Sequence, residues 1–199
     1  MFDSQRLPRD PIELFHAWLD AAKETLAPLP ESMALATTNL STGRPSVRMV
    51  MLHKATPQGF TFYTDYSSRK GQELSQNPSA SLLFFWGNLG YQVRVEGNVN
   101  KVDVKESDEY FNGRQRGSQL AAWASQQSSA ITSLTDLRQE WENYGRQFPS
   151  NVPRPQRWGG YRLRHQLMEF WKGDQDRLHD RILYTRQNTS SWSLTRLSP

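Results

Sequence analysis

The chain of 199 residues is long enough for one domain whose hydrophobic core needs no metal or disulfide to fold. It has no cysteine, which excludes disulfides and thiolate chemistry, and its four histidines lack the spacing of paired metal ligands, so we expect no metal site. A net charge of +4, with Lys and Arg spread along the sequence, suits small anionic ligands; the aromatic residues fit core packing better than nucleic-acid binding.

The N-terminal region predicts a helix in a soluble protein. Residues 1–6 carry neither a basic segment nor an apolar run, so we expect no secretion signal and a cytoplasmic protein. No apolar run approaches the ~20 residues that a membrane helix needs, which argues against a membrane protein. Asp10 and Pro11 are typical of an N-cap and a first helical position, and apolar residues follow at helical spacing. We therefore predict a helix over residues 10–26.

The rest of the chain predicts a sheet with inserted helices. Tyr91, Val93 and Val95 alternate with polar residues, as in an antiparallel strand with one buried face. About eight such short strands favour a mainly β, α+β fold in one domain over 1–199, built on a small antiparallel barrel. The predicted strands cover 33–38, 47–53, 60–64, 81–86, 91–99, 160–171, 181–186 and 191–197, and further helices cover 67–76, 104–114, 118–125 and 134–148.

The start of the helix at 67–76 is a candidate phosphate site. Arg69 and Lys70 lie in its first turn, where free backbone N–H groups and the helix dipole favour an anion. An ordinary capped helix with solvated basic residues is the alternative. Arg48 lies in an apolar strand and must find a partner, for which a protein carboxylate and a ligand phosphate serve equally well.

Two further polar groups could serve a ligand. Tyr110, Arg114 and Ser118 are spaced four apart, so on a continuous helix they would share one face and suit a second phosphate. Gly113 and Gly117 leave open the alternative of a frayed helix end. The segment with Gln127 and Ser128 offers amide and hydroxyl groups for the edge of a heterocycle, although capping or loop chemistry explains it equally well.

Residues 171–181 hold two arginines, one histidine and three acids beside an aromatic residue. Guanidinium and imidazole groups next to an aromatic ring suit a pocket for an anionic, planar ligand. The alternative is a charged hairpin on the surface.

Taken in order, these segments resemble the pyridoxamine/pyridoxine 5′-phosphate oxidase family over nearly the whole chain, from about residue 8 to residue 199. The strand Arg48-Met49-Val50 and the C-terminal segment are the most specific parts. The resemblance implies a homodimer of split β-barrels with FMN at the subunit interface, and strands for dimerisation and substrate at about 158–199. It further implies an oxidase of pyridoxine biosynthesis. Hydride would pass from C4′ of pyridoxine or pyridoxamine 5′-phosphate to the flavin N5, with O2 as acceptor, giving pyridoxal 5′-phosphate, H2O2 and, from the amine, NH3.

The resemblance also implies a role for each matching residue. Arg177 would be catalytic by positioning the reacting carbon, and His179 by bonding the ring substituents. The FMN contacts would be Arg48, Met49, Val50, Met51, Leu52, His53, Tyr63, Thr64, Arg69, Lys70, Gln92, Gln127, Ser128, Trp171 and Arg181. The substrate contacts would be His53, Tyr110, Arg114, Ser118, Arg177, Leu178 and His179.

The sequence departs from the family pattern at two places. His53 stands where the family usually has lysine, and because histidine is mostly neutral above about pH 7, we expect weaker binding of the substrate phosphate there. Lys54 should not replace that charge, since successive strand residues point to opposite faces. Only nine residues precede Asp10, which is short for a lid over the substrate.

Two other functions stay open. One is a related flavin oxidase of the same fold that acts on another aromatic substrate, of the phenazine-pathway type. The other is a flavin- or haem-binding split barrel without turnover. The presence of Tyr110, Arg114 and Ser118 favours a phosphorylated substrate, and therefore an oxidase of vitamin B6 phosphates over both alternatives.

Overall fold

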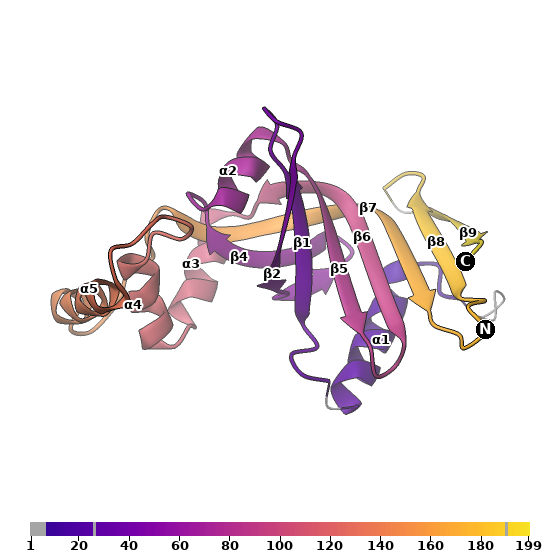
Figure 1. The fold of residues 1–199 in the computed structure, drawn as a ribbon, viewed down its shortest axis with the longest axis horizontal. Coiled ribbons are helices and arrows are strands. Elements are labelled where there is room, and N and C mark those ends of the chain that lie inside the picture. Colours follow the sequence, from indigo (N-terminus) through magenta and orange to yellow (C-terminus); the bar gives the residue numbers. More distant parts are fainter. Residues whose placement is uncertain (1–6, 26, 190) are drawn as a thin grey trace.

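The computed structural model describes residues 7–25, 27–189 and 191–199, and over these residues a single antiparallel sheet of nine strands is the main element (Figure 1). This confirms the predicted mainly β fold with inserted helices, with one strand more than expected. In chain order the elements are α1 (Pro11–Glu24), β1 (Ser32–Thr38), β2 (Pro45–Met51), β3 (Lys54–Thr56), β4 (Gly59–Asp65), α2 (Arg69–Gln76), β5 (Ser79–Trp86), β6 (Tyr91–Lys101), α3 (Val104–Asn112), α4 (Arg116–Ala124), α5 (Leu134–Gln147), β7 (Trp158–Lys172), β8 (Asp180–Arg186) and β9 (Trp192–Leu197).

The longest strand, β7, connects the two ends of the molecule. The sheet order is β2-β1-β5-β6-β7-β4-β3, and β8 and β9 extend it from β7. β6 runs along nearly all of β7, whereas β4 pairs with its first part and β8 with its last part. Since a strand rises about 3.3 Å per residue, Trp158 and Trp171 lie about 40 Å apart along β7. Figure 1 shows β7 crossing from the helices α3–α5 to the hairpin of β8 and β9.

The first helix packs on the core of the sheet because its sequence gives it one apolar face. Asp10 caps it by accepting a hydrogen bond from the N–H of Ile12 at 3.0 Å, and Pro11 occupies the first turn. Phe15 is fully buried, and its ring lies edge-on 4.9 Å from the rings of Phe60 and Phe84. This aromatic cluster anchors α1 to strands β4 and β5.

Helices α3, α4 and α5 form a smaller unit beside the sheet (Figure 1). Their own core contains Phe111, Leu120, Val152 and Trp158. Trp158 is the first residue of β7, so this second core is attached directly to the sheet. The unit therefore places α3 and α4 next to one end of β7.

Two predicted elements differ from the structure. The helix expected to reach Leu26 ends at Glu24 with Thr25 as its C-cap, and Leu26 lies outside the described residues. The predicted strand 47–53 stops at Met51. The N–H of Leu52 donates to the carbonyl of Glu31, just before β1, and the N–H of His53 donates to the carbonyl of Thr61 on β4, so the pairing of β2 with β1 does not continue. The strand resumes as the short β3.

A third point concerns the segment from Tyr110 to Ser118, for which the sequence left a continuous helix and a helix end as alternatives. α3 ends at Asn112, Gly113 is its C-cap, and α4 begins at Arg116, so the two separate helices are confirmed and the three residues do not share one helix face. The remaining elements are confirmed within a few residues. In the described parts of the chain, the model shows no helix long and apolar enough to span a bilayer.

Candidate functional site

A buried lysine marks the start of α2. Lys70 is 6% exposed, and its Nζ donates to Gln127 Oε1 at 2.8 Å and to Thr64 Oγ1 at 3.2 Å. Both acceptors are neutral, and among the described residues no carboxylate lies within ion-pair distance of Nζ. Burial lowers the pKa of Lys70 to about 8. A buried ammonium at a helix N-terminus, held only by neutral acceptors, fits an anionic ligand such as a phosphate.

Next to it, Glu73 holds two arginines. The carboxylate is 3% exposed and accepts hydrogen bonds from Arg69 Nε at 2.9 Å and Arg48 Nη2 at 3.2 Å. Burial raises its pKa, but hydrogen bonds from Ser46, Thr37 and Arg69 outweigh this and lower it to about 2. The partner of Arg48 within the chain is therefore a carboxylate, one of the two options that the sequence left open.

A second cation without an acidic partner lies close by. The guanidinium of Arg114 lies 4.5 Å over the ring of Trp158, and its buried Nη1 has no hydrogen-bond partner among the described residues. Burial lowers the pKa of Arg114, but the group stays charged. Arg114, Ser118 and Gln127 line one cavity of about 210 Å³. Because Gln127 also binds Lys70, the two cations flank the same space.

Stacked aromatic rings form the wall beside this cavity. Tyr63 stacks on Tyr110 with ring centroids 3.8 Å apart and also lies parallel to Trp158 at 5.5 Å. The ring of His53 meets Tyr110 at 4.4 Å. The structure therefore brings together four predicted substrate residues, His53, Tyr110, Arg114 and Ser118, although they come from a loop, two helices and the turn between them.

The imidazole of His53 carries little positive charge at neutral pH. Burial, and then the positive charge of Lys54, lower the pKa of His53 below its usual value. Lys54 itself lies 3.3 Å from Glu106, which also accepts two hydrogen bonds from Arg162 at 2.7 Å. Lys54 is thus engaged by Glu106, and His53 is neutral near pH 7.

The other predicted residues lie at the far end of β7. Trp171 is directly opposite Gln92 on β6 and Arg181 on β8, so the three side chains form one row on one face of the sheet. The ring of His179 lies 4.6 Å from that of Trp171. Its Nδ1 accepts a hydrogen bond from the Asp174 N–H at 3.1 Å, which places the ring hydrogen of the neutral form on Nε2.

Two candidate residues have unusual backbone conformations. Arg177 has φ +62° and Ser128 has φ +72°, in the left-handed region that non-glycine residues seldom adopt. Arg177 and the 72% exposed Leu178 lie in the loop between β7 and β8. Strained backbone of this kind is common in ligand-binding loops.

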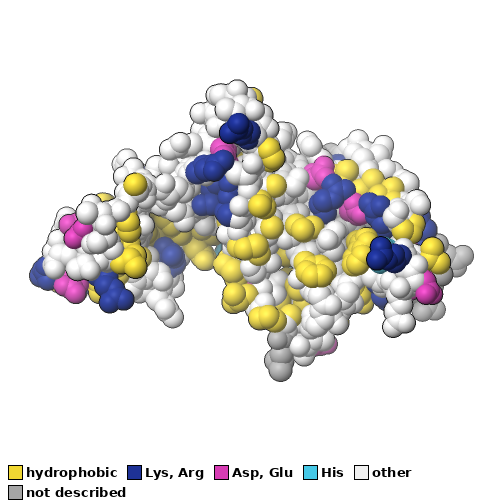
Figure 2. Space-filling view, in the orientation of Figure 1, with side chains coloured by type: hydrophobic (Ala, Val, Ile, Leu, Met, Phe, Trp, Pro, Cys, Tyr) yellow, Lys and Arg dark blue, Asp and Glu magenta, His cyan; other side chains and the backbone are white. Residues whose placement is uncertain are grey.

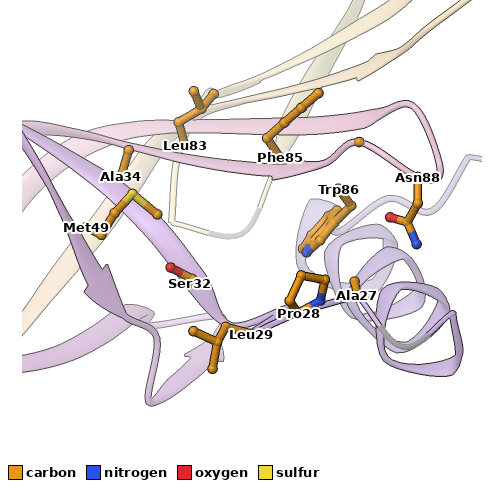
Figure 3. A pocket seen from close by; sticks show the side chains of 11 residues that line it. Ala27, Pro28, Leu29, Ser32, Ala34, Met49, Leu83, Phe85, Trp86 and Asn88 are labelled. Carbon is orange, nitrogen blue, oxygen red and sulfur yellow. The ribbon is translucent and has the colours of Figure 1, made fainter.

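Strand β2 presents an apolar surface. Met49 and Met51 point outward, 62% and 48% exposed, while Val50 packs on the core and Leu52 is buried. A cavity of about 740 Å³ beside Met49 is lined by apolar and neutral side chains (Figure 3). Figure 2 shows apolar side chains over the region of β1 and β2, next to basic side chains near α2. An exposed apolar surface of this kind is typical of a protein–protein interface.

The predicted site residues therefore fall into two groups, one at each end of β7. Arg114 contacts Trp158 at the start of the strand, and His179 contacts Trp171 near its end, about 40 Å away along the strand. A ligand the size of a vitamer cannot touch both groups of one chain.

Sequence reasoning missed three residues that shape these groups. Glu73 follows Arg69 by four residues on a helix, which is a recognisable ion-pair spacing. Glu169 alternates with Trp171 on the predicted strand 160–171, a weaker signal. Trp158 carried no local signal, because its partners Tyr63, Tyr110 and Arg114 are distant in sequence.

The fold and the site together define an antiparallel split-barrel protein with a polar cavity beside two cations and a separate aromatic row. Residues 19–145 match the family model described as pyridoxamine 5′-phosphate oxidase. Residues 158–199 match the model of the pyridoxine 5′-phosphate oxidase C-terminal dimerisation region. The chain thus belongs to the pyridoxamine 5′-phosphate oxidase family. Family membership implies flavin binding, and the dimerisation region indicates a homodimer, as predicted.

Individual relatives are similar over their whole length. A pyridoxine/pyridoxamine 5′-phosphate oxidase of Paraburkholderia phymatum is 48% identical over 96% of this chain and 89% of its own, and one of Burkholderia mallei is 47% identical over 99% and 92%. Among solved structures, PhzG from Burkholderia lata in complex with tetrahydrophenazine-1-carboxylic acid has a TM-score of 0.93 at 33% identity, covering 100% of this chain and 98% of its own. An FMN-binding, oxidase-related protein of Nostoc punctiforme shares the fold, with a TM-score of 0.74 at 18% identity over 97% of this chain and 100% of its own.

Proposed function

We propose that this chain is an FMN-dependent oxidase of vitamin B6 phosphates. It converts pyridoxine 5′-phosphate or pyridoxamine 5′-phosphate to pyridoxal 5′-phosphate with O2 as acceptor, and releases H2O2 and, from the amine, NH3. The curated relatives at 47–48% identity support the substrate class.

The observation that carries the proposal is a pair of cations at one cavity: half-buried Arg114 lines it, and buried Lys70 is bonded to Gln127 in its wall. Lys70 at the start of α2 suits the phosphate of FMN, and Arg114 with Ser118 suits the phosphate of the vitamer. Each cation has donors that the described chain does not pair with an acid. Two adjacent anion positions match a reaction in which cofactor and substrate are both phosphate esters.

The residues of the far end complete the site when two chains associate. Arg177 and His179 of the partner subunit would then face the vitamer held by Arg114, because one chain cannot bring its own two groups together. The exposed apolar surface of β2, which association of two chains would bury, supports this arrangement.

Within that site each side chain has a definable task. Bound FMN supplies the two-electron acceptor for C4′ and passes the electrons to O2. Arg177 orients the reacting carbon of the vitamer. His179 donates from Nε2 to a ring substituent, because its Nδ1 is occupied by the Asp174 N–H. Trp171 and Gln92 supply a flat ring and an amide beside Arg181 for the heterocycle of the flavin.

An aerobic assay of the purified protein tests the proposal. We expect a yellow protein that releases FMN on denaturation and that produces H2O2 and pyridoxal 5′-phosphate from both vitamers. Unphosphorylated pyridoxine is the matched control and should react far more slowly, because it cannot use Arg114. A colourless protein that does not bind added FMN, or a flavoprotein without turnover of either vitamer, would contradict the proposal.

A second candidate is an oxidase of a phenazine precursor, favoured by the close structural similarity to PhzG. Its substrate would need no phosphate site, so Ser118→Ala would leave its turnover unchanged. Turnover of tetrahydrophenazine-1-carboxylic acid exceeding that of the vitamers would establish this alternative.

A further inference from the structure

We propose that Glu169 is a positioning residue that holds Arg181 in place for the flavin, an inference that rests on the proposed function. Glu169 lies on β7, two residues before Trp171, and therefore on the same face of the sheet as the row Gln92–Trp171–Arg181.

The carboxylate of Glu169 joins two arginines from neighbouring strands. It is 3% exposed, and its Oε1 accepts from Arg181 Nε at 2.8 Å, with Nη2 of the same arginine also 2.8 Å away. Its Oε2 accepts from Arg94 Nη2 at 2.5 Å. Burial raises the pKa of Glu169, but the hydrogen bonds from Arg181 and Arg94 outweigh it and keep the group ionised.

Arg181 is also held from its other side. Its Nη1 donates to the backbone carbonyl of Ser198 at 2.7 Å. Arginine carries five N–H donors in a rigid plane, so these contacts fix the plane and leave N–H groups on both Nη atoms for a ligand. Arg181 itself lies in the row with Trp171 and Gln92.

Fixing this guanidinium before the ligand arrives should strengthen flavin binding. A free arginine loses side-chain entropy when it becomes ordered on a ligand, whereas one already held by a carboxylate loses much less. Glutamine at position 169 would fill the same space but replace one anionic acceptor by an N–H donor facing an arginine. Arg181 would then lose its charged anchor while its own donors stayed intact.

The test uses Glu169→Gln with Glu96→Gln as the matched control. Glu96 also forms an ion pair with Arg94 from β6, but it is partly exposed and is not bonded to Arg181. FMN is titrated into each apoprotein, and quenching of flavin fluorescence gives Kd; thermal unfolding of the apoprotein is measured in parallel. We expect Kd to rise about tenfold in Glu169→Gln and less than about twofold in Glu96→Gln, since one charge-assisted hydrogen-bond set is lost.

A double-mutant cycle separates positioning from a general loss of structure. If Glu169 acts through Arg181, adding Glu169→Gln to Arg181→Gln should change Kd by less than about twofold. A tenfold effect that persists in the Arg181→Gln background, or a Glu169→Gln protein with wild-type Kd, overturns the proposal. A change in the melting temperature alone, with unchanged Kd, also overturns it.

A conservative variant covers the case in which Glu169→Gln does not fold. Glu169→Asp keeps the charge but shortens the reach, so it should fold and bind FMN more weakly than wild type; wild-type Kd would overturn the proposal. Failure of the proposed function is recognised separately, because wild-type apoprotein would then show no affinity for FMN.

Discussion

The cations near the two ends of β7 are held differently. Near its start, the buried Lys70 and the half-buried Arg114 have donors that no acid of the described chain satisfies. Their neighbours Arg48 and Arg69 share the carboxylate of Glu73. Near its end, Arg181 is held by the buried carboxylate of Glu169. Buried donors without an acid are suited to the charge of a ligand, and an arginine already held by an acid, such as Arg181, is suited to orienting a ring. The two groups of candidate residues thus lie near opposite ends of one strand.

The distance between the two groups predicts that one site takes Arg114 from one chain and His179 from the other. Subunit mixing tests this prediction, and the largest effect is expected here. Arg114→Ala and His179→Ala should each lower kcat/KM by at least about 100-fold, as when one stabilising donor is removed from an active site. Mixed dimers of the two variants regain one intact site in two, so random mixing should restore about a quarter of wild-type activity. The control mixes Arg114→Ala with the Arg114→Ala/His179→Ala double variant and should restore nothing. A mixture of the single variants that stays inactive after verified subunit exchange would refute the shared site.

Lys70→Met tests whether the group near the start of β7 binds the phosphate of FMN. Loss of a charge-assisted contact to phosphate should weaken FMN binding by about 100-fold, measured by fluorescence titration. The apoprotein should melt no lower than wild type, because a buried charge without an acidic partner is removed. The exposed Lys105→Met, on α3, is the control and should bind FMN normally. A large loss of apoprotein stability would mean that Lys70 is structural.

Titration of the same lysine gives a pH test. The pKa of Lys70 is lowered to about 8, so the charged form is present below that pH and is lost above it. FMN affinity of wild type should therefore fall between pH 7 and pH 9, and that of Lys70→Met should stay flat over the same range. Parallel decline in both proteins would assign the pH dependence to another group.

Substrate anchoring should respond to Ser118→Ala. Loss of one hydrogen bond to the vitamer phosphate should raise its KM about tenfold while leaving FMN affinity unchanged, because Ser118 lines the cavity on the Arg114 side. Ser125→Ala, at the same cavity, is the control. Equal effects on KM from both variants would show that the cavity is sensitive to any change of volume.

The smallest effect is expected at His53. The pKa of this imidazole lies below its usual value, so it is neutral at pH 8, whereas a lysine there would be charged. His53→Lys should lower KM for the vitamer about threefold at pH 8, with a smaller gain at acidic pH, where the histidine takes up a proton. An unchanged KM at pH 8 would show that the residue does not contact the phosphate.

Local signals in the sequence predicted most of the fold. The N-cap Asp10 with Pro11 located α1, and the alternation from Tyr91 onward located β6, because both patterns depend on neighbours a few residues away. The break after Met51 was missed, since Leu52 and His53 are apolar or aromatic and the turn depends on carbonyls from Glu31 and Thr61.

The site was predictable only in part, for the same reason. The resemblance supplied the candidate residues, and the structure places them in two groups that no local pattern distinguishes. The partner of Arg48 could not be chosen from the sequence, because Glu73 lies 25 residues away on α2. The roles of Glu169 and Trp158 likewise depend on strand register and on packing between distant segments.

The unpaired ammonium inside the first turn of α2 also bears on the lifetime of the protein in a cell. Without its ligand, the folded chain keeps a desolvated charge and is closer to unfolding; a bound phosphate ester raises stability by RT ln(1 + [L]/Kd). Proteases act mainly on opened chains, so the protein without a bound phosphate ester should be degraded faster than the same protein in complex.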